Sequence, residues 1–224
     1  MRTVLARVRD GALKRPWLAA PPLLGVVAQR VLWSMSAPDA GPGGAYLRGF
    51  AGAVLTVAVT AAFAELWLGD GAGLDAGRFA DTGLLFLLPY PLLLLVGAAS
   101  TPLVYGLLHS GAGEGLVYGV LYAVVALGKL SAYAFGAASS LAVARRGEAK
   151  GIPSALALGF KTLWANAGFF ALLLPAAWVL QEACAFAARS AGLGIVSGVF
   201  TTAIPLLACV AAPIEAWRAG TLRQ

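Results

Sequence analysis

The sequence has little of the charge, histidine and sulfur on which most enzymes and metalloproteins rely. Of 224 residues only 12% are charged, and His109 is the single histidine. The two cysteines, Cys184 and Cys209, fall in or beside apolar stretches, where a thiol behaves as a small apolar side chain. This inventory leaves no multi-histidine centre, disulfide framework or zinc motif. We therefore expect the protein to bind no metal and no cofactor.

Apolar side chains and glycine are present in excess. The chain is 60% apolar with 28 glycines, and its mean hydropathy is +0.82. Soluble domains average just under half apolar residues and about a quarter charged residues. The excess excludes a soluble enzyme, a disordered chain and a nucleic-acid-binding protein, so we expect no nucleic-acid partner. It predicts that residues 1–224 form a single integral membrane domain.

Long apolar runs predict the number of membrane crossings. A bilayer core about 30 Å thick needs roughly 20 apolar residues per helix. Six such runs occur, at approximately 17–36, 46–68, 83–108, 116–140, 163–182 and 192–216. The fourth has room to continue to Ala144. The six tryptophans lie near the ends of these runs, as expected of aromatic belts at the two membrane surfaces.

Two further segments have the pattern of amphipathic helices that lie along a membrane surface. Near the N-terminus, Val4, Leu5 and Val8 share a helical face that the basic residues avoid. In residues 151–163 the apolar side chains again align, and Pro153 suits a first helical turn. The predicted fold is thus all-α: a polytopic membrane helix bundle with six transmembrane helices and two interfacial amphipathic helices.

The basic residues predict the orientation, because lysine and arginine accumulate in short cytoplasmic loops. With the N-terminus inside, twelve of them fall on the inner side and three on the outer side, namely Arg30, Arg48 and Arg189. This predicts a multi-pass protein of the bacterial cytoplasmic (inner) membrane with both termini in the cytoplasm. A rival interpretation takes residues 1–37 as a secretory signal, although Arg30 interrupts its apolar run.

Polar residues recur on one face of the fourth run. At helical periodicity an arc of about 60° holds Gly115, Tyr118, Tyr122, Lys129, Tyr133, Gly136 and Ser140. A lysine at the bilayer centre costs on the order of 3 kcal/mol, so it usually faces a bundle interior or a watery cavity. The structural alternative is that Lys129 extends its alkyl stem toward the inner surface and the small residues serve helix packing.

The third run is interrupted by Pro89, Pro91 and Pro102. Proline donates no backbone hydrogen bond, so the carbonyls of Leu85 and Leu87 need other partners. Interrupted helices often mark binding sites in transporters. Our hypothesis is that a substrate pocket in the inner half of the membrane contains Tyr90 and Lys129, with further candidates Tyr118, Tyr122, Tyr133 and Ser140. A simple kink is the alternative.

Charged residues near the inner ends of the runs predict contacts with lipid and with each other. The candidates for lipid headgroups are Arg145, Arg146, Lys150 and Lys161. Glu65 and Glu215 lie within a turn of their span ends. We expect them to form rim salt bridges, with Arg145, Lys161 or Arg218 as partners.

Enzyme signatures are not found in the sequence. No proposed span contains an aspartate, and neither a His-Glu-x-x-His motif nor a nucleophile elbow occurs. We therefore expect no catalytic residues. The segments Lys-Arg-Pro-Trp-Leu (14–18) and Gly-Phe-Lys-Thr-Leu-Trp-Ala-Asn-Ala-Gly-Phe-Phe (159–170), in a six-span layout, resemble uncharacterised bacterial membrane proteins related to the membrane domain of some glycerophosphodiesterases. That resemblance implies a multi-pass protein and supplies no catalytic residue.

Three classes of function fit this reading. The first is a small-molecule or ion transporter, or a membrane subunit of a transport complex, which the polar stripe and the interrupted run favour. The second is a non-transporting membrane partner or assembly factor, which would bind another protein. The third is a lipid-associated, membrane-shaping protein that uses the two surface helices. Membrane lipids are the expected partners in all three, and the oligomeric state is left open.

Overall fold

The protein is described from a computed structural model, which covers residues 2–34, 41–69, 76–88, 102–103, 105–145 and 151–223. Within these ranges the side chains at 33, 41–49, 125 and 129 are not described. Every regular element in the described part of the chain is helical. The predicted all-α class is confirmed for these residues.

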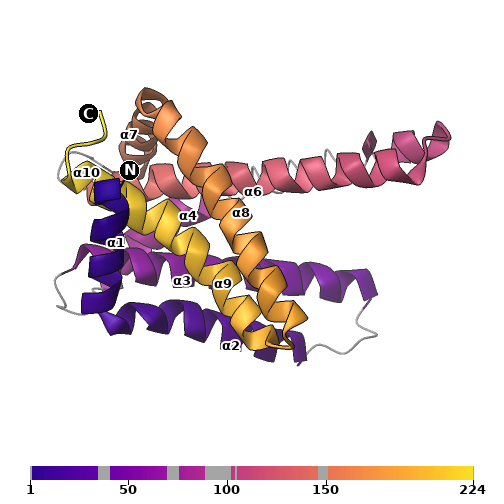
Figure 1. Ribbon diagram of the computed structural model, residues 1–224, viewed down its shortest axis with the longest axis horizontal. Coiled ribbons are helices and arrows are strands. Elements are labelled where there is room, and N and C mark those ends of the chain that lie inside the picture. Colours follow the sequence, from indigo (N-terminus) through magenta and orange to yellow (C-terminus); the bar gives the residue numbers. More distant parts are fainter. Residues whose placement is uncertain are drawn as a thin grey trace.

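The helices follow one another along the chain (Figure 1). In order they are α1 (Arg2–Lys14), the 3-10 helix η1 (Pro16–Ala19), α2 (Ala20–Ser34), α3 (Gly41–Leu68), α4 (Ala76–Leu87), α6 (Glu114–Ala144), α7 (Ile152–Ala165), α8 (Ala167–Ser190), α9 (Gly194–Leu206), the π-helical turn η2 (Leu207–Ala211) and α10 (Ala212–Arg218).

The helices pack as a bundle with both chain ends at one end of it. Figure 1 shows α2, α3 and α6 along the long axis, while α8 and α9 cross them as a neighbouring pair. The N- and C-termini lie together at the end formed by α1 and α10, which contact each other. We call this end the terminal end. The core lies where α3, α6 and η2 meet, and its largest buried side chains include Trp67, Leu141 and Ile214.

Four helices among the described residues are long and apolar enough to cross a membrane. They are Phe50–Leu68, Glu114–Ala144, Ala167–Ser190 and Gly194–Arg218. Their outer faces are apolar, because at most 39% of each apolar window is buried inside the protein. An exposed apolar surface of this extent is unfavourable in water and is typical of helices that face lipid. The prediction of an apolar, membrane-type helix bundle is confirmed at this level.

Two of the six predicted spans are not found as long helices in the described part of the chain. The first run forms α2, whose 15 residues fall short of the roughly 20 that a bilayer needs. In the third run α4 begins at Ala76 and ends at Leu87, and residues 89–101 lie outside the described ranges. The fifth predicted span also begins later than predicted, because α7 ends at Ala165 and the spanning helix α8 starts at Ala167, after Asn166.

Consecutive serines on α6 bind carbonyls that proline leaves without a helical donor. The Ser139 hydroxyl donates to the carbonyl of Leu85 at 2.8 Å, four residues before Pro89. The Ser140 hydroxyl donates to the carbonyl of Cys209 at 2.7 Å, four residues before Pro213. Both serines are buried. The prediction that the Leu85 carbonyl needs a new partner is confirmed, and the two bonds fix α6 to α4 and to η2.

Replacing Ser140 by alanine is expected to lower the free energy of unfolding by about 1–3 kcal/mol, the cost of a buried carbonyl without its donor. The measurement is equilibrium unfolding of the purified protein in detergent micelles. Ser110→Ala is the matched control, since Ser110 is exposed and its hydroxyl binds only the carbonyl of Leu107. Equal stability of the two variants would contradict this assignment.

The two segments predicted to lie on the membrane surface do form amphipathic helices. In α1, Val4 and Val8 are buried. In α7 the buried residues are the small ones, Ala155, Gly159 and Thr162. The large apolar face predicted for α7 is only partly covered, and Phe160 is 47% exposed. The α7 helix therefore docks on α6 through small side chains, because these allow the two backbones to approach closely.

Candidate functional site

A mostly apolar pocket with a few hydroxyl groups lies between α2, α3, α6 and α9, and we call it the central pocket. It consists of two adjoining cavities of about 130 Å³ and 280 Å³. The residues that both cavities share are Thr56, Thr60, Tyr133, Pro205 and Leu206.

The central pocket sits at mid-depth in the candidate spans. Val59 and Leu206 are the middle residues of Phe50–Leu68 and Gly194–Arg218. Both line one of the two cavities. Tyr133 lies one helical turn beyond the middle of α6. Substrate sites of transporters also lie near the bilayer midplane.

The hydroxyl groups of the central pocket already donate their protons to the protein. Thr56 and Thr60 donate to the carbonyls one turn earlier in α3, at 2.8 Å and 2.7 Å. Thr201 and Thr202, which line the larger cavity, both donate to the carbonyl of Gly198, at 2.8 Å and 3.1 Å. A hydroxyl oxygen that has donated keeps lone pairs for accepting. The threonine oxygens therefore face the pocket as hydrogen-bond acceptors.

Tyr133 completes the same pattern from α6. Its hydroxyl donates to Oε1 of Gln181, a buried side chain of α8. The tyrosine is partly buried and lines both cavities. Its phenolic oxygen thus has lone pairs left, and the contact ties α6 to α8 beside the pocket. A solute that carries N–H or O–H donors complements these oxygens, and Gln29, which lines the larger cavity, adds a side-chain amide that both donates and accepts.

The pocket also lies where the helix Gly194–Arg218 departs from regular α-helical hydrogen bonding. Pro205 supplies no N–H to the carbonyl of Thr201, four residues earlier. The π-helical turn η2, Leu207–Ala211, follows directly. Single π-helical turns inside α-helices are rare and frequently occur at functional sites. Thr201 therefore brings two acceptors to the pocket region, its hydroxyl oxygen and a carbonyl that proline has left without its helical donor.

The predicted substrate residues do not gather at one place. Tyr133 lines the central pocket, but Tyr118 and Tyr122 are 68% and 63% exposed on the first half of α6. Ser140 is fully buried and holds helix carbonyls instead of facing a cavity. The backbone of Lys129 belongs to α6, whereas its side chain lies outside the described part of the chain.

The Tyr90 half of the predicted pocket also falls outside the described residues, so the pairing of Tyr90 with Lys129 stays a prediction. Sequence reasoning missed the threonines on α3 and α9. A signal was available in their spacing. Thr56 and Thr60 are one turn apart within an apolar run, and Thr201 and Thr202 lie one turn before Pro205.

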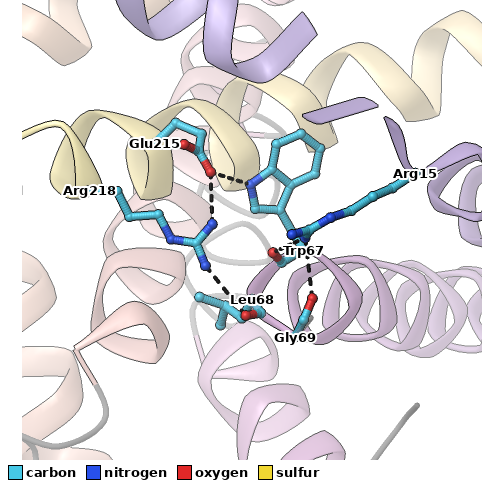
Figure 2. Close-up of polar contacts among 6 residues, drawn as sticks. All are labelled: Arg15, Trp67, Leu68, Gly69, Glu215 and Arg218. Atoms are coloured by element: carbon cyan, nitrogen blue, oxygen red, sulfur yellow. Dashed lines mark hydrogen bonds and ion pairs between the residues drawn. The ribbon is translucent and has the colours of Figure 1, made fainter. Parts of the chain in front are cut away.

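A cluster of hydrogen-bonded polar side chains lies at the terminal end of the bundle (Figure 2). Trp67, at the end of α3, donates from Nε1 to Oε1 of Glu215 at 3.1 Å. Arg218 pairs with the same carboxylate oxygen at 2.9 Å. Arg15 donates to the carbonyls of Trp67 and Gly69, at 3.1 Å and 3.2 Å. The predicted rim salt bridge of Glu215 with Arg218 is confirmed, and the cluster joins η1, α3 and α10.

The predicted lipid-facing residues take different positions. Arg145 is only 4% exposed and donates to the hydroxyl of Thr162 at 3.2 Å. Its guanidinium is therefore packed between α6 and α7, and the expectation that it meets lipid headgroups is wrong for this residue. Lys161 is exposed on α7. Arg146 and Lys150 lie outside the described ranges.

The other predicted rim acid, Glu65, is also inside the protein. It is 7% exposed and accepts a hydrogen bond of 2.5 Å from the hydroxyl of Thr82, on α4. Like the Arg145 contact, this bond joins helices instead of facing the membrane surface.

The helices and the central pocket together define the class: an all-helical protein whose described part contains four helices long and apolar enough to span a membrane. No family model, curated protein or solved structure matches the chain.

Proposed function

We propose that the protein is a small-molecule or ion transporter, or a membrane subunit of a transport complex, and that the central pocket binds its solute. The observation that carries this proposal is the acceptor lining at mid-depth, formed by threonine and tyrosine oxygens whose protons are already donated. Such a lining favours a solute rich in hydrogen-bond donors, and a primary ammonium group is the simplest example.

The helix geometry supports movement of that solute. Transporters commonly form their sites with discontinuous helices, whose unwound carbonyls coordinate cations. Here the helix Gly194–Arg218 is continuous, but Pro205 and η2 disturb its regular hydrogen bonding along one wall of the pocket. Thr56 and Thr201 are exposed, whereas Leu206 is buried at 4%. Thr56 and Thr201 thus lie at the mouth of the pocket, and Leu206 lies at its floor.

The proposal includes the topology that the sequence predicts. It takes the protein as multi-pass in the bacterial inner membrane, with six spans, two surface helices and both termini in the cytoplasm. The position of both termini at one end of the bundle supports this arrangement. Basic residues gather at that end, among them Arg7, Lys14, Arg15 and Arg218, as expected on the cytoplasmic side. A relationship to the six-span proteins named above belongs to the same proposal.

Uptake into proteoliposomes tests the proposal, with radiolabelled methylammonium as the solute. Tyr133→Phe and Thr60→Val are expected to lower uptake by about tenfold or more, because each removes an acceptor from a cation that loses water on entry. Tyr118→Phe is the matched control, since Tyr118 lies on the same helix but outside the pocket. Its uptake should equal that of the wild type.

A second probe separates hydrogen bonding from charge alone. Tetramethylammonium carries the same charge but no N–H donor, so it should compete poorly with methylammonium. Equal competition by the two cations would contradict the acceptor assignment. An equal loss in Tyr118→Phe and Tyr133→Phe would contradict the location. Absence of uptake by the wild-type protein would contradict transport of a primary ammonium solute by this chain alone.

The second candidate function is that of a non-transporting membrane partner. The N-terminal end of α6 extends beyond α2, α3, α8 and α9 in Figure 1. Only 12% of the α6 apolar window is buried, and Leu116 and Leu127 are 57% and 61% exposed. A helix face of this kind suits packing against a helix of another membrane protein.

A further inference from the structure

Helix α1 lies between two hollows of opposite character at the terminal end of the bundle. One hollow, the basic cleft, has a volume of about 370 Å³, and the residues used below are Arg7, Asp10, Lys14, Arg15, Glu215 and Arg218. The other hollow, the apolar groove, has about 380 Å³ and runs between α1 and α8, with Leu5, Val8, Leu173, Ala176, Leu180 and Leu207.

The basic cleft carries more positive than negative charge. Its four cations face two carboxylates, and both carboxylates are already engaged. Asp10 accepts from Arg9 at 2.9 Å. Glu215 accepts from Arg218 at 2.9 Å and from the indole of Trp67 at 3.1 Å (Figure 2). The cleft is therefore electropositive and suits an anion.

The four cations of the basic cleft fall into two pairs. Arg15 and Arg218 donate to backbone carbonyls at the end of α3, whereas the other two keep their donors for a ligand. Arg7 and Lys14 are exposed and make no hydrogen bond or ion pair with the described part of the chain. They lie two helical turns apart on one side of α1, so a group placed between them meets both.

The apolar groove lies at membrane depth. Leu173, Ala176 and Leu180 belong to the apolar helix Ala167–Ser190, which is long enough to span the membrane. Leu5 and Leu180 expose 52% and 55% of their surface. In that position the surrounding medium is hydrocarbon. An acyl chain therefore fits the groove better than a polar peptide does.

We propose that α1 is a binding site for an anionic phospholipid. The phosphate group lies in the basic cleft against Arg7 and Lys14, and one acyl chain lies in the apolar groove along Leu5 and Leu180. The two hollows share α1 as a common wall, which allows one molecule to occupy both. This site is separate from the central pocket, and it does not depend on transport.

Native mass spectrometry tests the site with an equimolar mixture of phosphatidylglycerol and phosphatidylcholine that carry identical acyl chains. The wild-type protein should retain phosphatidylglycerol in excess by about tenfold or more, given about 1 kcal/mol for each basic residue near an anionic headgroup. The double variant Arg7→Gln/Lys14→Gln should bring the ratio close to one. Arg7→Lys/Lys14→Arg should keep the preference, because both charges remain.

Matched controls separate a specific site from general attraction. Arg2→Gln/Lys161→Gln removes the same net charge from exposed positions outside the cleft. It should change the ratio less than twofold. Ala176→Trp fills the apolar groove and should weaken retention of both lipids. Ala171→Trp, at an exposed position of α8 outside the groove, should not.

The competing occupant is free phosphate, and inorganic phosphate and glycerol 3-phosphate are the probes for it. Displacement of phosphatidylglycerol by millimolar concentrations of either, with no effect of Ala176→Trp, would make this a soluble-phosphate site and would overturn the proposal. Equal retention of the two lipids by the wild type would also overturn it. So would a loss of preference in the control double variant as large as that in Arg7→Gln/Lys14→Gln.

Discussion

Replacing Trp67 by alanine is expected to lower the free energy of unfolding by about 3–5 kcal/mol, the cost of deleting a large buried aromatic side chain. Trp67 is 2% exposed and stacks on Phe63 with ring centroids 5.7 Å apart. Its indole N–H binds Glu215 at 3.1 Å, and a Cβ built on Gly11 of α1 would lie 3.2 Å from the ring. One side chain thus holds α1, α3 and α10 together.

Equilibrium unfolding in detergent micelles measures this loss. Trp164→Ala is the control, because Trp164 is 84% exposed on α7 and should cost little. Trp67→Phe should recover part of the packing but not the hydrogen bond, so its stability should fall between those of the wild type and Trp67→Ala. A similar loss in the Trp164 and Trp67 variants would mean that burial of Trp67 does not hold the terminal end together.

A glycine-to-alanine substitution is expected to raise the stability of the protein in one helix and to lower it in another. At Gly168 in α8 no atom lies within 4 Å of an added Cβ, and alanine should stabilise the protein by about 0.4–1 kcal/mol. At Gly159 in α7 the added Cβ would lie 2.4 Å from the carbonyl oxygen of Ala138. The two backbones must separate, which should cost about 1–3 kcal/mol or more.

Thermal unfolding of the two variants, measured by circular dichroism, decides this prediction. The Gly168→Ala midpoint should rise and the Gly159→Ala midpoint should fall relative to the wild type. Near-ultraviolet spectra should also change for Gly159→Ala, because Phe160 packs on Phe135 of α6 with ring centroids 5.0 Å apart. A rise in both midpoints would mean that α7 does not pack closely on α6.

The sequence predicted the features that follow from local composition and backbone chemistry. Apolar runs identify the four long helices, because a segment in lipid must satisfy its backbone N–H and C=O groups within itself and therefore forms a helix. The need of the Leu85 carbonyl for a donor follows from Pro89 alone, and Ser139 meets it. The partner could not be predicted, because Ser139 lies 54 residues further along the chain.

Sequence patterns assigned some residues at helix ends to the membrane surface, but tertiary packing buries them inside the protein. Trp67 sits at a helix end, where an aromatic belt predicts contact with the membrane surface, yet it is the largest fully buried side chain described. Arg145 follows a span and has the pattern of a lipid-facing arginine, but α7 folds over it. A helix end and its covering helix are far apart in sequence. Local patterns therefore carry no information on which rim residues are covered.

The candidate pocket was predicted in part. The stripe on α6 pointed to Tyr133, because a tyrosine at mid-span needs a polar partner. Tyr118 and Tyr122 share that stripe, but both are exposed, and the ring of Tyr122 packs on Trp178 of α8 outside the pocket. The threonines escaped notice because threonine is common in membrane helices and often bonds its own backbone. Only the crossing of α3, α6 and α9 turns those oxygens into one lining.

The π-helical turn η2 sets the rotational phase of everything that follows it. One extra residue in a turn rotates all later side chains by about 100° relative to an uninterrupted α-helix. Ile214 points into the core and Glu215 meets the indole of Trp67 in the phase that this turn creates. Removing one residue between Leu207 and Ala211 would swing that carboxylate away from the indole. The number of residues in this turn therefore determines which side chains of α10 face the core and which meet Trp67.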